Sequence, residues 1–105
     1  MNLETRYDRY YLTYSGASLP LKMLSALSED SIENRNTYFG VNLDALGRII
    51  TVHKLVYGSI ELSHHYEYDE QGYLAFAQIN NTDGEANKLW FDDGGNLVRR
   101  EEECQ

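Results

Sequence analysis

The chain has 105 residues, and its 17 acidic and 9 basic side chains give a formal net charge of −8. This length suits a single domain with one modest core. The acidic excess disfavours direct binding to nucleic acid or to anionic membranes, and it favours a protein partner with a basic face. No apolar run has the length of a membrane span or a signal peptide, so we expect a cytoplasmic protein.

Residues 1–36 predict a hairpin followed by a short helix. Residues 7–14 show the alternation of side chains that is typical of a strand and are rich in tyrosine. A turn signal follows, and residues 18–24 again have a strand pattern. Ser28 then precedes two acidic residues, which is typical of a helix N-cap, so we expect one short helix near 29–35. Because a single sheet cannot bury its own apolar face, this N-terminal part is expected to cover the sheet that follows.

One seven-residue phrase occurs three times after residue 36. It consists of an aromatic or aliphatic residue, Asp, two variable residues, Gly, one variable residue and then Leu or Ile. The aspartates are Asp44, Asp69 and Asp92, and their steps of 25 and 23 residues indicate a repeat. Asp can accept hydrogen bonds from the backbone ahead of it, and the Gly three residues later can adopt a positive φ. Each copy therefore predicts a hairpin tip with a three-residue loop, so that the first residue of the phrase faces the last: Leu43 with Ile49, Tyr68 with Leu74 and Phe91 with Leu97.

Two further turns complete a pattern of strands from residue 37 to 100. Gly58-Ser59 and Asp83-Gly84 each suit a two-residue hairpin loop. The predicted fold class is mainly β, with a single antiparallel meander sheet of about six to eight strands that is curved or a half-barrel. We interpret residues 1–105 as a single domain that ends in an acidic tail, 101–105. The six strands expected in the meander are 37–43, 48–57, 60–68, 73–80, 86–91 and 96–100.

The middle copy of the phrase reads Tyr68-Asp69-Glu70-Gln71-Gly72-Tyr73-Leu74. It resembles the YD repeat of large bacterial RHS-type surface and toxin-shell proteins, and the other copies have Leu43 and Phe91 in place of the tyrosine. The resemblance covers about residues 41–100 and implies hairpins without catalytic residues. Residues 11–16, 19–21 and 33–39 are also similar to small bacterial proteins of unknown function. Neither resemblance implies an activity.

Pairing across the Gly58-Ser59 loop predicts that Leu55 faces Leu62 and that His53 faces His64, all on the apolar face. One further row of this apolar face is expected to consist of Val41, Thr51, Tyr66, Phe76, Phe91 and Leu97. Gln78 falls in the same row on the next strand. Two facing imidazoles can share a divalent metal or titrate as a coupled pair, but the row offers no third strong ligand. The row is interpreted as hydrogen-bonded core residues, as a small-ligand pocket or as a metal site. No resident metal or cofactor is predicted.

No catalytic site can be assembled from the sequence. The carboxylates lie mainly in turns or on the mixed face of the predicted sheet, and neither a nucleophile on a strand–turn–helix nor a glycine-rich phosphate loop occurs. The single cysteine, Cys104, follows three glutamates, which disfavour its thiolate. We therefore expect a protein that is not an enzyme.

The chain contains nine tyrosines, more than a core of this size needs, and tyrosine and arginine are enriched at interface hot spots. The sequence favours an acidic protein-binding module, such as a small inhibitor or immunity-type protein of bacterial or phage origin that acts on a basic partner. The alternative is a small-ligand or metal-binding sheet protein that uses His53, His64 and Gln78. A homodimer through an edge strand is compatible with both. The residues expected to contact the partner are Tyr7, Arg9, Tyr10, Tyr11, Tyr14, Glu61 and Glu67.

Overall fold

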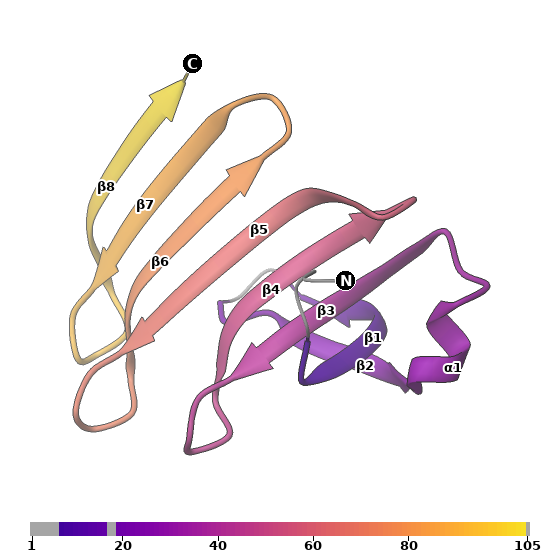
Figure 1. The fold of residues 1–105 in the computed structure, drawn as a ribbon. Helices are drawn as coiled ribbons and strands as arrows, with labels where there is room; N and C mark the ends of the chain where they lie inside the picture. Colours follow the sequence, from indigo (N-terminus) through magenta and orange to yellow (C-terminus); the bar gives the residue numbers. More distant parts are fainter. Residues whose placement is uncertain (1–6, 17–18, 105) are drawn as a thin grey trace.

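A computed structural model describes residues 7–16 and 19–104. In this part of the chain, eight strands form one sheet in the order β2-β1-β3-β4-β5-β6-β7-β8, and all neighbours are antiparallel (Figure 1). The predicted mainly-β antiparallel fold is confirmed. The elements are β1 Arg9–Ser15, β2 Lys22–Leu27, α1 Glu29–Ile32, β3 Thr37–Leu43, β4 Ile49–Val56, β5 Ser59–Tyr68, β6 Leu74–Asn81, β7 Glu85–Phe91 and β8 Leu97–Cys104.

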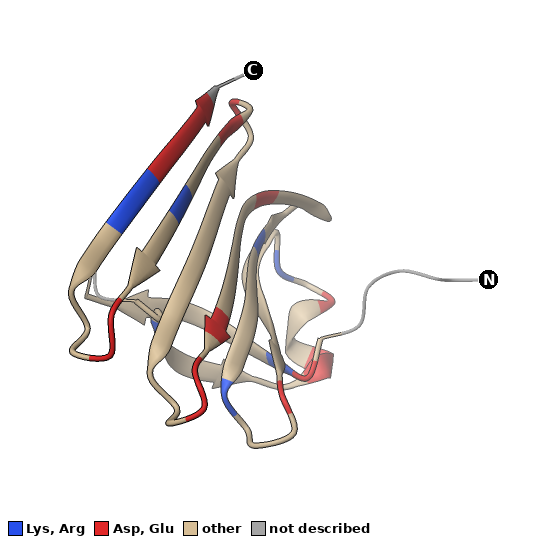
Figure 2. Ribbon diagram, turned by 90° about the vertical axis from the view of Figure 1, so that its left-hand side faces the viewer, with Lys and Arg blue, Asp and Glu red and all other residues tan. Residues whose placement is uncertain are grey.

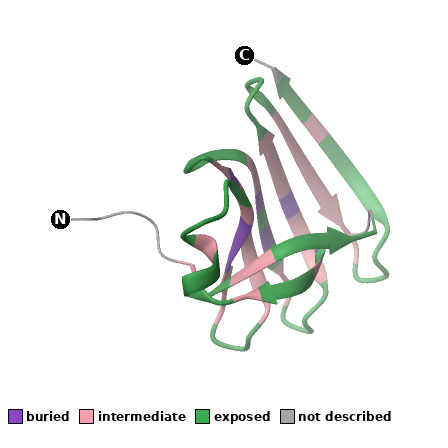
Figure 3. Cartoon of the chain, turned by 90° about the vertical axis from the view of Figure 1, so that its right-hand side faces the viewer, coloured by how far each residue is buried: buried purple, intermediate pink, exposed green. Residues whose placement is uncertain are grey.

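The sheet is curved, and the β1–β2 hairpin passes across the concave side of the later strands (Figures 1 and 3). The backbone N–H of Leu21, beside β2, donates to the Tyr66 hydroxyl of β5 at 3.1 Å, which fixes the hairpin to the sheet. The hairpin thus covers the apolar face, as expected. The core residues are Leu21, Phe39, Val41, Val52, Tyr66 and Ala77.

Helix α1 is shorter than predicted and does not cover the sheet. It ends at Ile32 and not near residue 35, and it has no buried residue. The N-cap prediction is confirmed, because Ser28 Oγ accepts a hydrogen bond from the Ser31 N–H at 3.2 Å. With one apolar residue, the segment offers no stripe that could dock a longer helix.

The three copies of the Asp-x-x-Gly phrase form the same turn. In the first copy, Asp44 Oδ1 accepts the N–H groups of Leu46 and Arg48, each at 2.9 Å, and the Gly47 N–H donates to the Asp44 carbonyl. Asp69 and Asp92 make the equivalent bonds. The predicted positive φ and three facing pairs are confirmed: φ is 83° at Gly47, 92° at Gly72 and 84° at Gly95, and the pairs are Leu43 with Ile49, Tyr68 with Leu74 and Phe91 with Leu97.

The predicted two-residue loop at Asp83-Gly84 is wrong, because the β6–β7 connection is a fourth turn of the same kind. Asn81 Oδ1 accepts the N–H groups of Asp83 and Glu85 at 3.0 and 3.2 Å, and Gly84 has φ 83°. The carboxamide oxygen of Asn81 thus replaces the carboxylate oxygen of the aspartates. The loop therefore has three residues.

The predicted loop at Gly58-Ser59 is also wrong. Strands β4 and β5 are joined by Tyr57 and Gly58, both with positive φ (50° and 82°), so that Val56 faces Ser59. A register shift follows beyond Leu55, which faces Ile60. The predicted pairs of Leu55 with Leu62 and of His53 with His64 do not form.

A β-bulge follows each of the three Asp-x-x-Gly turns. Leu43 faces Ile49 but Asn42 faces Thr51, so Ile50 has no partner, and the pairings leave Ala75 and Val98 unpaired at the equivalent positions. A shift of one residue moves all later side chains to the other face. Thr51 and Phe76, expected on the apolar face, therefore lie on the opposite, convex face.

The expected acidic tail is part of the sheet. Residues Glu101 to Cys104 belong to β8 and pair with β7, where Glu101 faces Lys88 and Glu102 faces Asn87. Residue 105 lies outside the described residues. Strand β8 is thus longer than the predicted strand at 96–100, and Lys88 places a cation opposite its first glutamate, Glu101.

Candidate functional site

A groove of about 770 Å³ lies on the concave side of the sheet, at the end where the Asp-x-x-Gly turns gather. The connection between β1 and β2 forms one wall of it, through Leu19 and Pro20. The opposite wall is largely apolar and aromatic. It consists of Arg48, Tyr68, Gly72, Tyr73, Leu74, Leu89, Phe91, Gly95 and Leu97.

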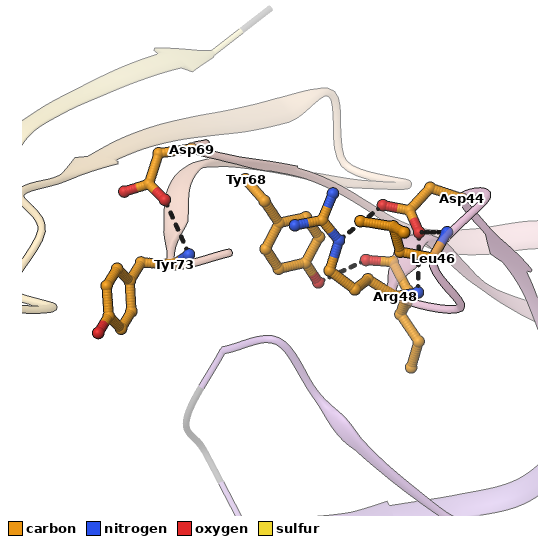
Figure 4. A network of polar contacts seen from close by, with 7 residues as sticks. Asp44, Leu46, Arg48, Tyr68, Asp69 and Tyr73 are labelled. Atoms are coloured by element: carbon orange, nitrogen blue, oxygen red, sulfur yellow. Dashed lines mark hydrogen bonds and ion pairs between the residues drawn. The ribbon is translucent and has the colours of Figure 1, made fainter. Parts of the chain in front are cut away.

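Arg48 is the only charged side chain among the described residues that line this groove. Its Nε donates to Asp44 Oδ2 at 2.8 Å, and its guanidinium carbon lies 4.7 Å from the centre of the Tyr68 ring (Figure 4). The guanidinium also lies beside Gly72 of the β5–β6 turn, where a Cβ would be in ordinary van der Waals contact with Arg48 Nη1, at 3.7 Å. Arg48 thus connects the β3–β4 turn to the β5–β6 turn.

The charge of Asp44 is stabilised by the turn that holds it. The backbone N–H of Arg48 lowers the pKa of this carboxyl, as do the side chain of Arg48 and the N–H of Leu46. The carboxylate therefore stays ionised and keeps Nε occupied. No acceptor for the two Nη groups is found in the described part of the chain, so they can donate to a ligand.

The Tyr68 ring, which supports the guanidinium, is fixed in turn by the sheet. Its hydroxyl donates to the carbonyl oxygen of Ile49 at 2.6 Å, and burial raises its pKa. A planar guanidinium that stacks on an aromatic ring and has unpaired Nη groups can bind a carboxylate through bidentate hydrogen bonds. The groove can accept a ligand with an apolar body and one anionic group.

The predicted histidine row is wrong, because His53 and His64 lie on opposite faces. His53 faces Ser63, whereas His64 faces Val52 of the core. Gln78 faces His65, which lies on the convex face and whose Nε2 is 3.1 Å from Glu67 Oε2. Within the described residues, no three His, Cys, Asp or Glu side chains are placed to hold a metal ion.

Each of the two histidines has a tyrosine partner. His53 Nδ1 lies 2.7 Å from the hydroxyl of Tyr7, and burial lowers the His53 pKa. His64 Nδ1 lies 2.7 Å from the hydroxyl of Tyr66, and burial lowers the His64 pKa to about 4. Both imidazoles are therefore neutral near pH 7, and His64 is a core residue.

The residues expected to contact a partner do not form one patch. Tyr7 and Tyr10 pack edge to face on the convex side, where Tyr10 also meets Tyr38. Tyr11 packs against the core and Tyr14 contacts Phe39, so these two belong to the concave side. The remaining three predicted residues are exposed: Arg9, Glu61 and Glu67.

The convex face carries an aromatic cluster that the sequence analysis did not identify. The rings of Phe76 and Trp90 lie 5.2 Å apart, and the guanidinium of Arg99 lies 4.9 Å from the centre of the Trp90 ring. These residues were missed because the bulge at Ala75 was not foreseen, which placed Phe76 on the wrong face. The signal for this cluster in the sequence is the alternation of side chains between the two faces, counted from the residue after the bulge.

The lining of the groove did leave a signal in the sequence. The first and last positions of the second and third copies of the phrase line the groove: Tyr68, Leu74, Phe91 and Leu97. The phrase therefore specifies both the turn and the apolar wall beside it. Only the placement of residues 19 and 20 against that wall needed the structure.

The sequence profile of a family of unknown function, DUF6156, matches residues 4–100, and the chain belongs to this family. No curated protein matches the chain significantly, and no solved structure does. The likeness of the turn phrases to YD repeats stays a prediction. Among the described residues, no helix has the length and apolar character needed to cross a membrane.

Proposed function

We propose that this member of the DUF6156 family is a non-enzymatic binding protein for a small molecule with an apolar body and one anionic group, held in the concave groove. The observation that carries the proposal is the position of Arg48. It is the one charged group lining an otherwise apolar and aromatic groove, with both Nη groups available.

The size and composition of the groove support a small ligand. Its volume of about 770 Å³ lies within the range of roughly 300–1,000 Å³ that is common for small-molecule sites, and such sites are mostly apolar with a few placed polar groups. Leu89 and Phe91 would contact the apolar body. Arg48 would bind the anionic end and set the orientation of the ligand.

Decanoate is a suitable probe, and the uncharged decanol is its matched control. We expect decanoate to shift the backbone amide resonances of Arg48, Gly72 and Gly95, because these residues line the groove. Arg48→Gln should weaken decanoate binding by about tenfold or more, as a charge-assisted hydrogen bond is lost, and should leave decanol binding unchanged. Arg99→Gln, on the convex face, should affect neither probe.

Two outcomes would contradict the proposal. Resonance shifts confined to residues outside the groove would exclude the site itself. Equal binding of decanoate by the wild type and by Arg48→Gln would exclude the anionic preference, although the apolar groove could then still bind neutral ligands.

Binding of a basic protein partner, as a small inhibitor or immunity-type protein would do, is the second candidate. It is favoured by the half-buried pair of Phe76 and Trp90 with the exposed Arg99 beside it, since tryptophan and arginine dominate interface hot spots. Glu67, one of the residues expected to bind a partner, faces Phe76. A partner that is retained by the wild type and by Arg48→Gln but lost with Trp90→Ala would favour this function over the groove.

A further inference from the structure

Strand β8 is an edge of the sheet that is open to pairing. It pairs with β7 on one side, and no described strand pairs with its other side. Figure 2 shows this margin, with a basic segment followed by an acidic segment along β8. The opposite edge, β2, is interrupted by Ser25 with φ 63°, whereas β8 is regular after the bulge at Val98. A regular edge strand presents unpaired N–H and C=O groups.

The charges of β8 occur in two blocks. Arg99 and Arg100 are followed by Glu101, Glu102 and Glu103, and these side chains are exposed or half-exposed. A strand with charges of one sign would repel a copy of itself, which is a common protection of edge strands. Two blocks of opposite sign act differently, because an antiparallel copy places the acidic block of one strand opposite the basic block of the other.

Symmetry restricts the possible registers of such a pair. When a two-fold axis relates two antiparallel edge strands, each side chain points to the same face of the joined sheet in both copies. Because facing residues of antiparallel strands also share a face, one residue must face its own copy at the axis. With Glu101 at the axis, Arg100 faces Glu102 and Arg99 faces Glu103, each twice. This register makes four contacts of opposite charge and one of like charge.

The neighbouring registers are worse. With Arg100 at the axis, only the pair of Arg99 and Glu101 has opposite charges, and Arg100 faces itself. With Glu102 at the axis, Glu101 faces Glu103. The repulsion between the two copies of Glu101 is reduced by cations within each copy, since Glu101 faces Lys88 of β7 and forms an ion pair with Arg99.

We propose that two copies of this chain join through β8, antiparallel and centred on Glu101, so that one sheet runs through both. The backbone hydrogen bonds of the added strand supply affinity, and the charge blocks select the register and the partner. Because the ion pairs are exposed, each contributes little and is screened by salt. The dimer is therefore weak, and it dissociates as the salt concentration rises.

Sedimentation velocity over a range of protein concentrations at low and high salt tests the proposal. We expect a concentration-dependent dimer at low salt. Arg99→Glu with Arg100→Glu makes the strand all acidic, and Glu102→Arg with Glu103→Arg makes its outer positions basic. Each double variant should raise the dimer dissociation constant by about a hundredfold, since four attractive contacts become repulsive. An equimolar mixture of the two double variants should restore a dimer that contains one copy of each.

A matched control changes the same charge elsewhere. Glu33→Arg with Glu70→Arg alters two exposed residues, at the C-cap of α1 and on the β5–β6 turn, and this variant should dimerise at least as well as the wild type. Circular dichroism confirms that each variant is folded. A wild type that stays monomeric at low salt, double variants that dimerise like the control, or a mixture that forms no heterodimer would each overturn the proposal.

Discussion

The hydroxyl of Tyr66 joins two groups that the sequence separates widely. It accepts a hydrogen bond from the Leu21 N–H, and it lies 2.7 Å from His64 Nδ1. Because the hydroxyl oxygen accepts the Leu21 N–H, its own proton is available for Nδ1 of a neutral imidazole that is protonated at Nε2. Burial lowers the His64 pKa to about 4, which is consistent with this assignment.

The buried His64 makes the stability of the fold sensitive to acid. Above pH 6.5, the ordinary pKa of histidine, the imidazole is neutral in both states and the full stability is present. Between pH 6.5 and about 4 only the unfolded state binds the proton, so the free energy of unfolding falls, by about 3 kcal/mol in total. Urea denaturation at a series of pH values should show this loss in the wild type and a smaller one in His64→Gln.

His65→Gln is the matched control for this prediction. His65 is the next residue along β5 and is exposed, and the other titrating groups are the same in both variants. The free energy of unfolding of the His65→Gln variant should decrease as steeply as that of the wild type when the pH is lowered. If His64→Gln and His65→Gln had the same pH dependence, His64 would not be the group that titrates.

Four of the turns are built on one side-chain oxygen. Asp44, Asp69, Asp92 and Asn81 each accept two backbone N–H groups through Oδ1, and each is followed three residues later by a glycine with positive φ. The oxygen and the glycine are what the turn requires. The charge is not, since Asn81 forms the same turn.

Substitutions at Asp69 separate these two properties. Asp69→Asn keeps the acceptor and should change the free energy of unfolding by less than about 0.5 kcal/mol. Asp69→Ala removes two hydrogen bonds, from Gln71 and Tyr73, and should cost about 1–2 kcal/mol. Glu70→Ala, an exposed neighbour in the same turn, is the control for urea denaturation. A loss in Asp69→Ala no larger than in Glu70→Ala would show that the backbone alone holds the turn.

The turns could be predicted from the sequence because their chemistry is local. A phrase of seven residues contains both the acceptor and the glycine, so the three tips and their first facing pairs follow from it. The fourth tip was missed because Asn81 replaces Asp and the Asp83-Gly84 dipeptide suggested a shorter loop. Tyr57 adopts a positive φ that its own side chain does not favour, so the β4–β5 register could not be derived.

The assignment of faces depended on features that no short motif specifies. Each bulge adds one residue, at Ile50, Ala75 or Val98, and so reverses the side to which later residues point. Val41 and Tyr66 were placed correctly in the core, but His53 was placed on the wrong face. The candidate histidine site failed for this reason, and the groove could not be derived because no local pattern places Leu19 and Pro20 across from the strands that form its other wall.

At the scale of the whole molecule, the concave side is completed by the N-terminal hairpin. On the convex side, the ring of Tyr7 lies over Gly40, where a Cβ would come within 2.4 Å of the ring. The concave side holds the core and the groove, one wall of which is the connection through Leu19 and Pro20. The position of the hairpin therefore sets both the burial of the core and the shape of the groove.

Pairing with β3 holds the β1 strand of this hairpin, and the bond between Leu21 and Tyr66 ties the β2 end of the hairpin to the concave side of the sheet, so Tyr66→Phe should loosen that end. It leaves the Leu21 N–H and His64 Nδ1 buried without their partner, which should cost about 1–3 kcal/mol. Hydrogen exchange of the Leu21 amide should become faster than that of amides in β4 and β5. Tyr68→Phe is the matched control, because it also removes one hydroxyl, whose partner is the Ile49 carbonyl within the sheet. If Leu21 exchanged at the same rate in Tyr66→Phe as in Tyr68→Phe, the β1–β3 pairing and apolar packing would hold the hairpin without this bond, and decanoate binding in the groove would be insensitive to Tyr66.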